Sequence, residues 1–369
     1  MTKRSRTLLF FFLSLLVLIA TPILIFYALG YRINWQTRTI SQTGGLYLKT
    51  IPANATVFIN DKKQKNTDFL FGTVLIDNLL PKSYDIRIEK EGYKSWNKRL
   101  EVQEKQVAEA KNIILFPSQL NFKTLFDHTA AAWPSPDMAQ ILLQRQLAQS
   151  QSRLSLWNPK TNKETILVKQ LSFALHILSV QWDGDSQNVL IQFREKTALP
   201  IVFDREGQQC KEPACATKIL NAEPKAFEKV LAAAETDLLQ TLPDKREEIL
   251  SPDEKKVALT NGSEVWLFYL QNDEGQPRRT KGQRVLLSRF SESANHVTWM
   301  DNNHLLLSVG NDVRIIEIDD RDSINTYSLG SFPASSADKS SPEIFWGDQE
   351  KIVYILSNGI FSVSEKLIK

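Results

Sequence analysis

The residues of this chain that could do chemistry are few and widely spaced. Its two cysteines, Cys210 and Cys215, have no histidine near them in the sequence. They therefore lack the further ligands that a structural zinc site needs. They are either free thiols or the ends of a short disulfide loop, and an oxidising compartment would favour the disulfide.

Sequence motifs for catalysis and cofactor binding are absent. The chain has no G-x-S-x-G elbow, no phosphate-binding loop, no G-x-G-x-x-G pattern and no H-E-x-x-H motif. The acidic run Asp319–Asp322 lacks the spacing of a calcium loop. The four histidines are scattered, and we expect each to be structural: His128, His176, His296 and His304. We therefore expect no catalytic, cofactor-binding or metal-binding residues and a protein that is not an enzyme.

Charge and composition exclude several classes of protein. The 369 residues contain 45 Lys and Arg against 42 Asp and Glu, a formal net charge of +3. A nucleic-acid-binding protein would concentrate basic residues on one face, so we expect no nucleic-acid partner. The contents of 42% hydrophobic and 24% charged residues are those of a globular protein. They exclude a disordered chain and a membrane protein with many spans.

The N-terminus contains a stretch long enough to cross a membrane. No acidic residue precedes Asp61, and residues 7–29 carry no charge. A helix of that length spans about 34 Å, and a bilayer's hydrocarbon core is about 30 Å thick. We expect an uncleaved transmembrane signal-anchor, with residues 1–6 in the cytoplasm and residues 30–43 as a tether. The alternatives are a cleaved signal peptide, for which the exit lacks a small-x-small site, and a buried core helix.

Residues 44–117 have the pattern of a small β-sandwich. Tyr84, Ile86 and Ile88 alternate with charged residues, which is typical of a half-buried strand. Turn signals at Asn60-Asp61 and Glu91-Gly92 separate short apolar segments. We expect an antiparallel sandwich of about 70 residues.

Part of this region resembles the PEGA domain. The run Thr50–Asp61, TIPANATVFIND, is similar to the family's Pro, Gly-Ala and alternating strand before an Asp-Gly turn. Leu80–Tyr84 and Glu91–Tyr93 are similar to its Leu-x-Pro-Gly-x-Tyr and Gly-Tyr elements. The departures stand where the family has Gly: Asn54, Lys62 and Ser83. PEGA domains occur in bacterial and archaeal surface or membrane-anchored proteins, so the resemblance implies a structural or binding role.

Residues 118–369 contain a motif that recurs five times. Each copy has an aromatic or aliphatic residue, a turn with Asp or Asn, and an apolar strand. The copies start 49, 68, 49 and 47 residues apart, at Trp133, Trp182, Leu250, Trp299 and Trp346. A period of 40 to 50 residues with several strands per repeat indicates a β-propeller. We expect five blades, with six as the alternative, and residues 120–126 as the fourth strand of the last blade, which removes an open edge.

The turns of these repeats resemble those of TolB-type propellers, a WD-repeat-like group. The resemblance is carried by Trp133–Asp137, WPSPD, and Leu250–Asp253, LSPD. The family's turn usually ends in Gly, where this chain has Met138 and Glu254. We expect the turn aspartates to stabilise the turns through side-chain to backbone hydrogen bonds rather than to form a site.

The long interval between the second and third copies contains an insertion, about residues 207–245. It includes both cysteines and a helical run with apolar residues at three- and four-residue steps, namely Phe227, Val230, Leu231, Ala234, Leu238 and Leu242. We expect a helix that either packs on one propeller face or acts as a partner-docking or lid element.

The sequence therefore predicts an all-β protein after one transmembrane helix. We expect a single-pass protein of a prokaryotic cell membrane, with a cytoplasmic N-terminus and extracytoplasmic domains. Its propeller would bind a protein or glycan partner of the envelope. One alternative is an envelope glycosidase or lyase with carboxylates in the propeller channel. The other is inverted topology, with the propeller in the cytoplasm.

Overall fold

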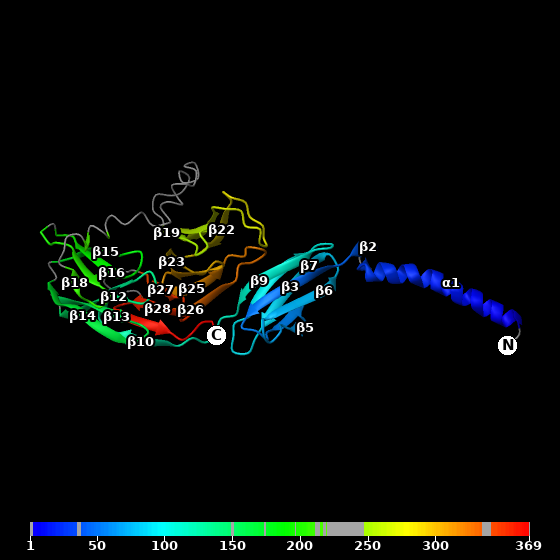
Figure 1. The fold of residues 1–369 in the computed structure, drawn as a ribbon, viewed down its shortest axis with the longest axis horizontal. Coiled ribbons are helices and arrows are strands. Elements are labelled where there is room, and N and C mark those ends of the chain that lie inside the picture. The colour runs from blue at the N-terminus through cyan, green and yellow to red at the C-terminus, as the bar shows by residue number, and fades with distance from the viewer. Residues whose placement is uncertain are drawn as a thin grey trace. The chain divides into compact units, whose positions relative to one another are not determined.

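The computed structural model describes residues 3–34, 38–148, 151–172, 175–195, 197–210, 215–216, 219, 247–333 and 341–368 (Figure 1). The chain divides into two compact units, Met1–Phe116 with Arg321–Asn325 and Pro117–Asp320 with Thr326–Lys369. One long helix, α1, precedes a succession of β-strands. The predicted fold class, all-β after one N-terminal helix, is confirmed.

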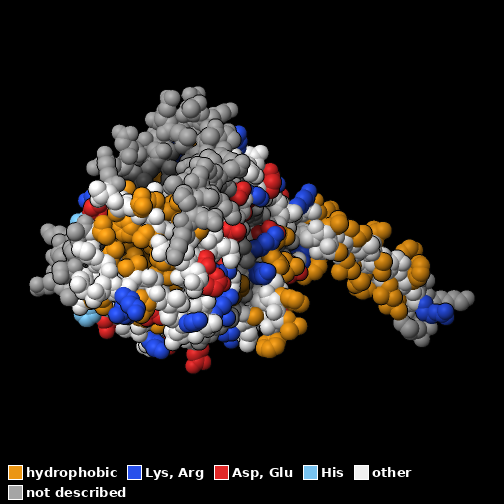
Figure 2. Space-filling model, turned by 60° about the vertical axis from the view of Figure 1, so that its left-hand side comes forward, with side chains coloured by type: hydrophobic (Ala, Val, Ile, Leu, Met, Phe, Trp, Pro, Cys, Tyr) orange, Lys and Arg blue, Asp and Glu red, His pale blue; other side chains and the backbone are white. Residues whose placement is uncertain are grey.

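The helix α1, Lys3–Ala28, carries the uncharged run of the N-terminus. Its segment Leu8–Ala28 is 21 residues long and apolar enough to cross a membrane, and none of its most apolar window is buried. Hydrophobic side chains cover the visible face of α1 in Figure 2. The core helix of a soluble protein would be mostly buried, so this exposure argues against the buried-helix alternative.

The segment after α1 contains a short pair of β-strands. β1, Tyr31–Asn34, and β2, Thr39–Gln42, pair as an antiparallel hairpin. The amide of Thr43 donates to the carbonyl of Gly30 at 2.9 Å and so closes the base of this hairpin. Eight of the fourteen residues of the predicted tether, residues 30–43, are therefore in paired strands.

The first unit contains a two-sheet sandwich. One sheet has the order β6-β3-β9 and the other has the order β5-β4-β7-β8. The strands are β3 Gly44–Ile51, β4 Thr56–Ile59, β5 Lys62–Asn66, β6 Thr73–Leu79, β7 Lys82–Glu89, β8 Trp96–Val102 and β9 Val107–Ile114. Alternate side chains of the sheets meet in one core around Leu48, Ile88 and Trp96. This alternation is what one buried face per sheet requires.

One pair in the sandwich departs from the antiparallel prediction. β3 and β9 run parallel, with Leu46 opposite Ala108. Along the chain, β9 follows β7 and β8 of the other sheet and then pairs with β3 in the first sheet. A parallel pair needs such a crossover, which a hairpin cannot supply.

In the part of the second unit that the structure describes, there are five four-stranded antiparallel sheets, in agreement with the five predicted blades. Blades 1 and 2 consist of consecutive strands, β11 Thr129–Pro134, β12 Ile141–Ala148, β13 Gln151–Asn158 and β14 Lys163–Ser172 in blade 1, and β15 Ile177–Trp182, β16 Asn188–Phe193, β17 Ile201–Asp204 and β18 Gln209–Cys210 in blade 2. Blades 3 and 4 do the same, with β19 Glu247–Leu250, β20 Lys256–Asn261, β21 Glu264–Tyr269 and β22 Arg284–Arg289 in blade 3, and β23 Ala294–Asp301, β24 His304–Val309, β25 Asp312–Glu317 and β26 Thr326–Ser331 in blade 4. Blade 5 combines the last three strands with an early one, namely β27 Glu343–Gly347, β28 Ile352–Ser357, β29 Ile360–Ser364 and β10 Phe122–Phe126.

Blade 5 joins the two ends of this unit. β10 pairs antiparallel with β29, with Phe122 opposite Ser364. This is the pairing that the sequence predicts for residues 120–126. The fourth strand of the last sheet therefore comes from the beginning of the unit and covers the edge that β29 would otherwise expose.

The second strand of each blade explains the continuous apolar runs of the repeat. In β12, Leu142 packs with Val189 of blade 2, whereas Ile141 and Leu143 pack with Tyr354 of blade 5. Successive side chains of a strand point to opposite faces, so a strand packed on both sides must be apolar at every position. The core of the unit thus lies between the blades.

Candidate functional site: the turns of the propeller

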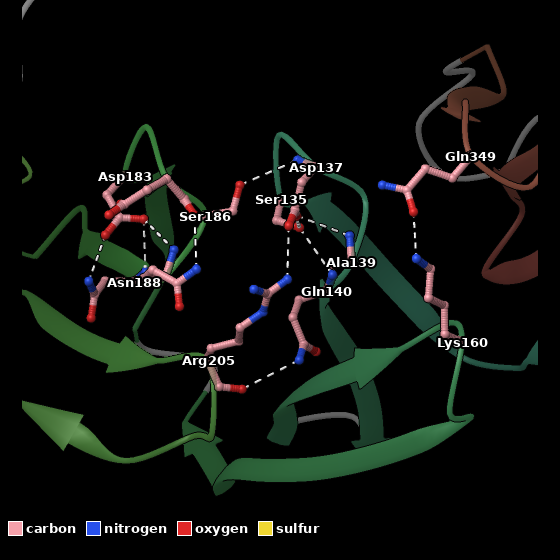
Figure 3. A network of polar contacts seen from close by, with 12 residues as sticks. Ser135, Asp137, Ala139, Gln140, Lys160, Asp183, Ser186, Asn188, Arg205 and Gln349 are labelled. Carbon is pink, nitrogen blue, oxygen red and sulfur yellow. Dashed lines mark hydrogen bonds and ion pairs between the residues drawn. The ribbon is translucent and has the colours of Figure 1, made fainter.

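The first hairpin of blades 1 and 3 turns on the sequence Ser-Pro-Asp. Figure 3 shows this turn in blade 1. In blade 1, Ser135 Oγ donates to Asp137 Oδ1 at 2.7 Å and accepts from the amide of Gln140 at 3.0 Å. Asp137 Oδ1 also accepts from the amide of Ala139 at 3.1 Å. Blade 3 repeats the arrangement, with Ser251 Oγ donating to Asp253 Oδ1 at 2.6 Å. The aspartates stabilise the turns, as expected from the sequence.

Blade 2 reaches the same turn with a different residue. Asp183 occupies the place of the serine, and its side chain accepts from the amides of Gln187 at 2.7 Å and Asn188 at 2.9 Å. Its second oxygen accepts from Asn188 Nδ2 at 2.6 Å. Asp183 is only 6% exposed. A buried carboxylate with its oxygens occupied in this way is a structural acceptor.

The turn position at which this chain departs from the Gly of TolB-type turns has a left-handed backbone in blades 1, 2 and 3. Met138 has φ 58°, Ser186 has φ 58° and Glu254 has φ 56°. Residues with a side chain adopt this conformation at a cost, which glycine avoids. These turns therefore keep a left-handed residue at this position although the residue is not glycine.

Polar contacts tie the turns of neighbouring blades together. Arg205 Nη2, from the β17–β18 turn of blade 2, lies 2.8 Å from Asp137 Oδ2 of blade 1. The amide of Asp137 donates to Ser186 Oγ at 3.3 Å. In blades 3 and 4 the amide of Asp253 donates to Asn302 Oδ1 at 3.0 Å. These contacts link blade 1 with blade 2 and blade 3 with blade 4 at that end of the propeller, and we call its turns the rim.

The tryptophans of the repeat contribute to the same connections. Trp182 Nε1 donates to the carbonyl of Trp133 in the previous blade at 3.3 Å. Trp299 Nε1 donates to the carbonyl of Ile249 at 3.0 Å. In blades 2 and 4 the repeated tryptophan thus links its blade to the previous one, whereas the indole nitrogen of Trp346 in blade 5 is buried without a hydrogen-bond partner among the described residues.

The electrostatics of the rim keep its aspartates ionised. Partial burial raises the pKa of Asp137, but hydrogen bonds from Ser135 and Ala139 and the charge of Arg205 outweigh it, so the pKa lies below its ordinary value. The pKa of Asp253 is also lowered, because Ser251 and Lys256 outweigh the opposing effect of burial. An ionised carboxylate whose oxygens accept turn hydrogen bonds is poorly suited to donate a proton.

Cys210 and Cys215 form a disulfide in the structure, with 6.5 Å between their Cα atoms. They pack against a small cluster in which Ile219 contacts Leu190 and Val202 of blade 2. Leu190 lies on the face of β16 that points away from blade 1. The described residues of the cysteine segment, Cys210, Cys215, Ala216 and Ile219, therefore cover part of this face. The predicted helical run at residues 227–242 lies outside the described residues.

The histidines and the acidic run form no common site. His304 is 2% exposed, and its Nδ1 lies 3.1 and 3.0 Å from the two carboxylate oxygens of Asp301. His176 Nδ1 lies 2.9 Å from Glu195 Oε1 on the surface of blade 2. Asp320 pairs with Arg279. Among the residues that the structure describes, no group of three or more His, Cys, Asp and Glu could hold a metal ion.

One exposed apolar surface could not be predicted from the sequence pattern. Phe69, Leu70 and Phe71, in the loop between β5 and β6, are 80%, 75% and 72% exposed. Three consecutive large apolar residues between Asp68 and Gly72 are visible in the sequence. A short apolar run is equally compatible with a buried strand, so its exposure becomes evident only in the fold.

Comparison with known proteins supports the first unit directly. Residues 43–113 match the family model described as PEGA domain. This confirms the resemblance seen in the sequence, over about the range predicted for the sandwich. No curated protein sequence matches the chain.

Solved structures match the chain over most of its length, at low similarity. A structural genomics protein of unknown function from Bacteroides thetaiotaomicron has 11% identity and a TM-score of 0.31, with 85% of this chain and 90% of that chain covered. TolB from Acinetobacter baumannii has 12% identity and a TM-score of 0.25, with 86% and 66% covered. Hsv2 from Kluyveromyces lactis has 9% identity and a TM-score of 0.23, with 77% and 66% covered. At these scores the propeller assignment rests on the five sheets themselves.

Proposed function

We propose that this chain is a single-pass membrane-anchored protein of a prokaryotic cell envelope, whose propeller binds a protein or glycan partner outside the cytoplasm. The observation that carries the proposal is α1, an apolar helix of membrane-spanning length that is exposed in the structure. It is followed by a domain that matches the PEGA family. An exposed helix of this kind is stable when lipid covers it.

The charge of the N-terminus and the chemistry of the cysteines support an orientation with the N-terminus in the cytoplasm. A short basic N-terminus before a first span usually stays in the cytoplasm, and the sequence has Lys3, Arg4 and Arg6 there. The β units would then lie outside. The pairing of Cys210 with Cys215 is consistent with this placement, since disulfides persist in oxidising compartments.

A binding role is favoured over catalysis by the chemistry of the rim. The carboxylates of Asp137, Asp183 and Asp253 are used as acceptors within the turns. Contacts between blades hold these turns at fixed positions. A rigid rim of short turns is the kind of scaffold on which propellers present binding surfaces.

Protease shaving of spheroplasts tests the placement. Added protease should remove the two β units and leave a fragment that contains α1 in the membrane pellet. The fragment should resist extraction with alkaline carbonate. Full protection of the β units would contradict the extracytoplasmic placement, and release of an intact soluble chain without residues 7–29 would favour a cleaved signal peptide.

Photo-crosslinking in cells tests the binding role. A photoreactive amino acid would replace Asp185, in the rim turn of blade 2, or Asn358, in the hairpin at the other end of blade 5. Both residues are exposed. A defined adduct from either position, abolished when the partner is deleted, supports binding. Absence of adducts from both positions would contradict it.

A further inference from the structure

The loop between β5 and β6 exposes an unusual apolar surface. Outside α1, the other exposed large hydrophobic residues of the described chain stand singly along the sequence. Phe69, Leu70 and Phe71 are consecutive, and each is at least 72% exposed. Scattered exposed apolar residues are ordinary in soluble proteins, whereas a contiguous patch usually marks an interaction site.

Polar contacts beneath the loop fix its shape. Asp68 Oδ1 accepts from the amides of Leu70 at 3.0 Å and Phe71 at 2.6 Å, and Oδ2 accepts from the amide of Thr73 at 2.6 Å. Gly72 has φ +66°, and a Cβ there would lie 2.2 Å from the carbonyl oxygen of Thr50. The loop is thus held from below, and its three apolar side chains are presented to solvent in a fixed arrangement.

The neighbouring edge strand is basic. All five residues of β5, Lys62–Asn66, are exposed, and they include Lys62, Lys63 and Lys65. β5 and β6 are the outer strands of their two sheets, so the loop joins two free edges on one side of the sandwich. We call Lys62, Lys63, Lys65 and Phe69–Phe71 the β5–β6 edge. Asp68 is the only acid between Lys62 and Ile76, and its oxygens accept the bonds described above.

We propose that the β5–β6 edge rests on the bilayer that holds α1, with Phe69, Leu70 and Phe71 among the lipid headgroups and the lysines against anionic lipid. The inference rests on the proposed membrane anchoring. Aromatic and aliphatic side chains enter the interface to about 5–10 Å, and lysines near the surface add attraction to anionic headgroups. The combination of a fixed apolar tip and a basic strand matches this surface better than an apolar patch alone would.

The length of the connection keeps the bilayer within reach. α1 ends at Ala28 and β3 begins at Gly44. Even a fully extended connection of that length would span only about 55 Å. The sandwich is therefore confined near the membrane at high effective concentration, where weak contacts are sufficient.

The topology also fixes the orientation that the contact requires. The chain enters β3 at Gly44, whereas the loop lies near Thr50 at the opposite end of that strand. An eight-residue strand is about 27 Å long. The sandwich must therefore lie along its β5–β6 side, because a sandwich standing upright would hold the loop away from the lipid.

The test uses the full-length chain in nanodiscs, with an environment-sensitive fluorophore on a cysteine introduced by Leu70→Cys. The labelling is done without reductant so that Cys210 and Cys215 stay paired. The matched control is Glu104→Cys, in the exposed β8–β9 loop at the Gly44 end of the sandwich. Phosphatidylglycerol-containing discs are compared with phosphatidylcholine discs, and brominated lipid serves as the quencher in both.

We expect brominated lipid to quench the probe at position 70 at least about twofold more than the probe at position 104, most strongly with phosphatidylglycerol. Lys62→Gln, Lys63→Gln and Lys65→Gln together should remove the preference for phosphatidylglycerol, and Phe69→Ser with Phe71→Ser should remove the quenching. Equal quenching at both positions, or a probe at position 70 that a second chain shields from aqueous quencher without lipid quenching, would overturn the proposal. Failure of the chain to enter discs would instead refute the anchoring itself.

Discussion

Arg205 of blade 2 donates from Nη2 to Asp137 Oδ2 of blade 1 across 2.8 Å, next to the serine hydroxyl that the same carboxylate accepts. The two residues are far apart in the sequence, and their pairing connects one blade's first turn with the next blade's outer turn. Trp182 makes the parallel connection from its indole nitrogen to the carbonyl of Trp133. The rim is thus held by contacts between blades as well as by the turns themselves.

Removal of the Asp183 carboxylate should destabilise the propeller more than removal of the Asp185 carboxylate. Asp183→Ala leaves the amides of Gln187 and Asn188 without their acceptor in a site that is 6% exposed. We expect a loss of about 2–3 kcal/mol. Asp185→Ala, at an exposed position of the same turn, should change stability by less than about 0.5 kcal/mol. Thermal and urea unfolding measure both, and equal losses would contradict the structural role of Asp183.

Glycine at the end of the blade 3 turn should stabilise the protein. Glu254 has φ 56° and an exposed side chain, so Glu254→Gly relieves the left-handed conformation without removing a packed group. We expect a gain of about 0.5–1 kcal/mol in the free energy of unfolding.

The control for this prediction is Lys255→Gly, one residue further along the turn. Lys255 is also exposed but is absent from the left-handed positions. The substitution should lower stability, because glycine adds freedom to the unfolded chain without relieving strain. A gain at both positions would mean that the left-handed backbone of Glu254 is not the cause.

The sequence predicts the propeller well because its signals are local and repeated. Ile141, Leu142 and Leu143 form an apolar run without alternation, as a strand packed on both faces requires. We expect residues 120–126 to complete the last sheet, and β10 pairs with β29 as expected. Each of these inferences depends on residues within one repeat or on counting repeats.

The sandwich contains features that local patterns do not encode. The parallel pairing of β3 with β9 depends on where the chain returns after two strands of the other sheet. Of the three positions where the family has Gly, Asn54 is left-handed, whereas Lys62 and Ser83 are not. Asn60 and Asp61, just before Lys62, are left-handed instead. The turn before β5 is thus made by Asn60-Asp61, and Lys62 already belongs to the strand. The exposure of Phe69–Phe71 follows from hydrogen bonds to Asp68, which no periodicity reveals.

The β5–β6 loop should lose its shape in acid. Hydrogen bonds from Thr73 and Phe71 lower the pKa of Asp68 from 3.8 to about 2. Because the folded-state pKa is the lower one, the stabilisation is complete above about pH 3.8 and is lost as the pH falls through about 2. The amide resonances of Leu70 and Phe71 should shift over this window. Asp68→Asn should remove the titration, and a shift that persists in this variant would assign it to another group.

Reduction of the disulfide between Cys210 and Cys215 should weaken the packing of these residues against blade 2. The bond closes a loop over a sequence separation of 5, for which chain entropy predicts about 2 kcal/mol of stabilisation. Reductant should therefore lower the unfolding temperature of the chain. It should also speed hydrogen exchange in β16 and β17, because Leu190 and Val202 pack against the segment that carries the cysteines.

The control for this effect is the double variant Cys210→Ser with Cys215→Ser. It should unfold at the temperature of the reduced protein, and reductant should not change that temperature. Intact-mass measurement of protein from the envelope fraction, alkylated without reduction, reads the native state directly. A disulfide excludes the alkylating agent from both sulfurs, whereas two free thiols each gain its mass. Double alkylation of folded protein would show that the bond is absent in the cell, and it would remove the cysteine argument for an oxidising compartment.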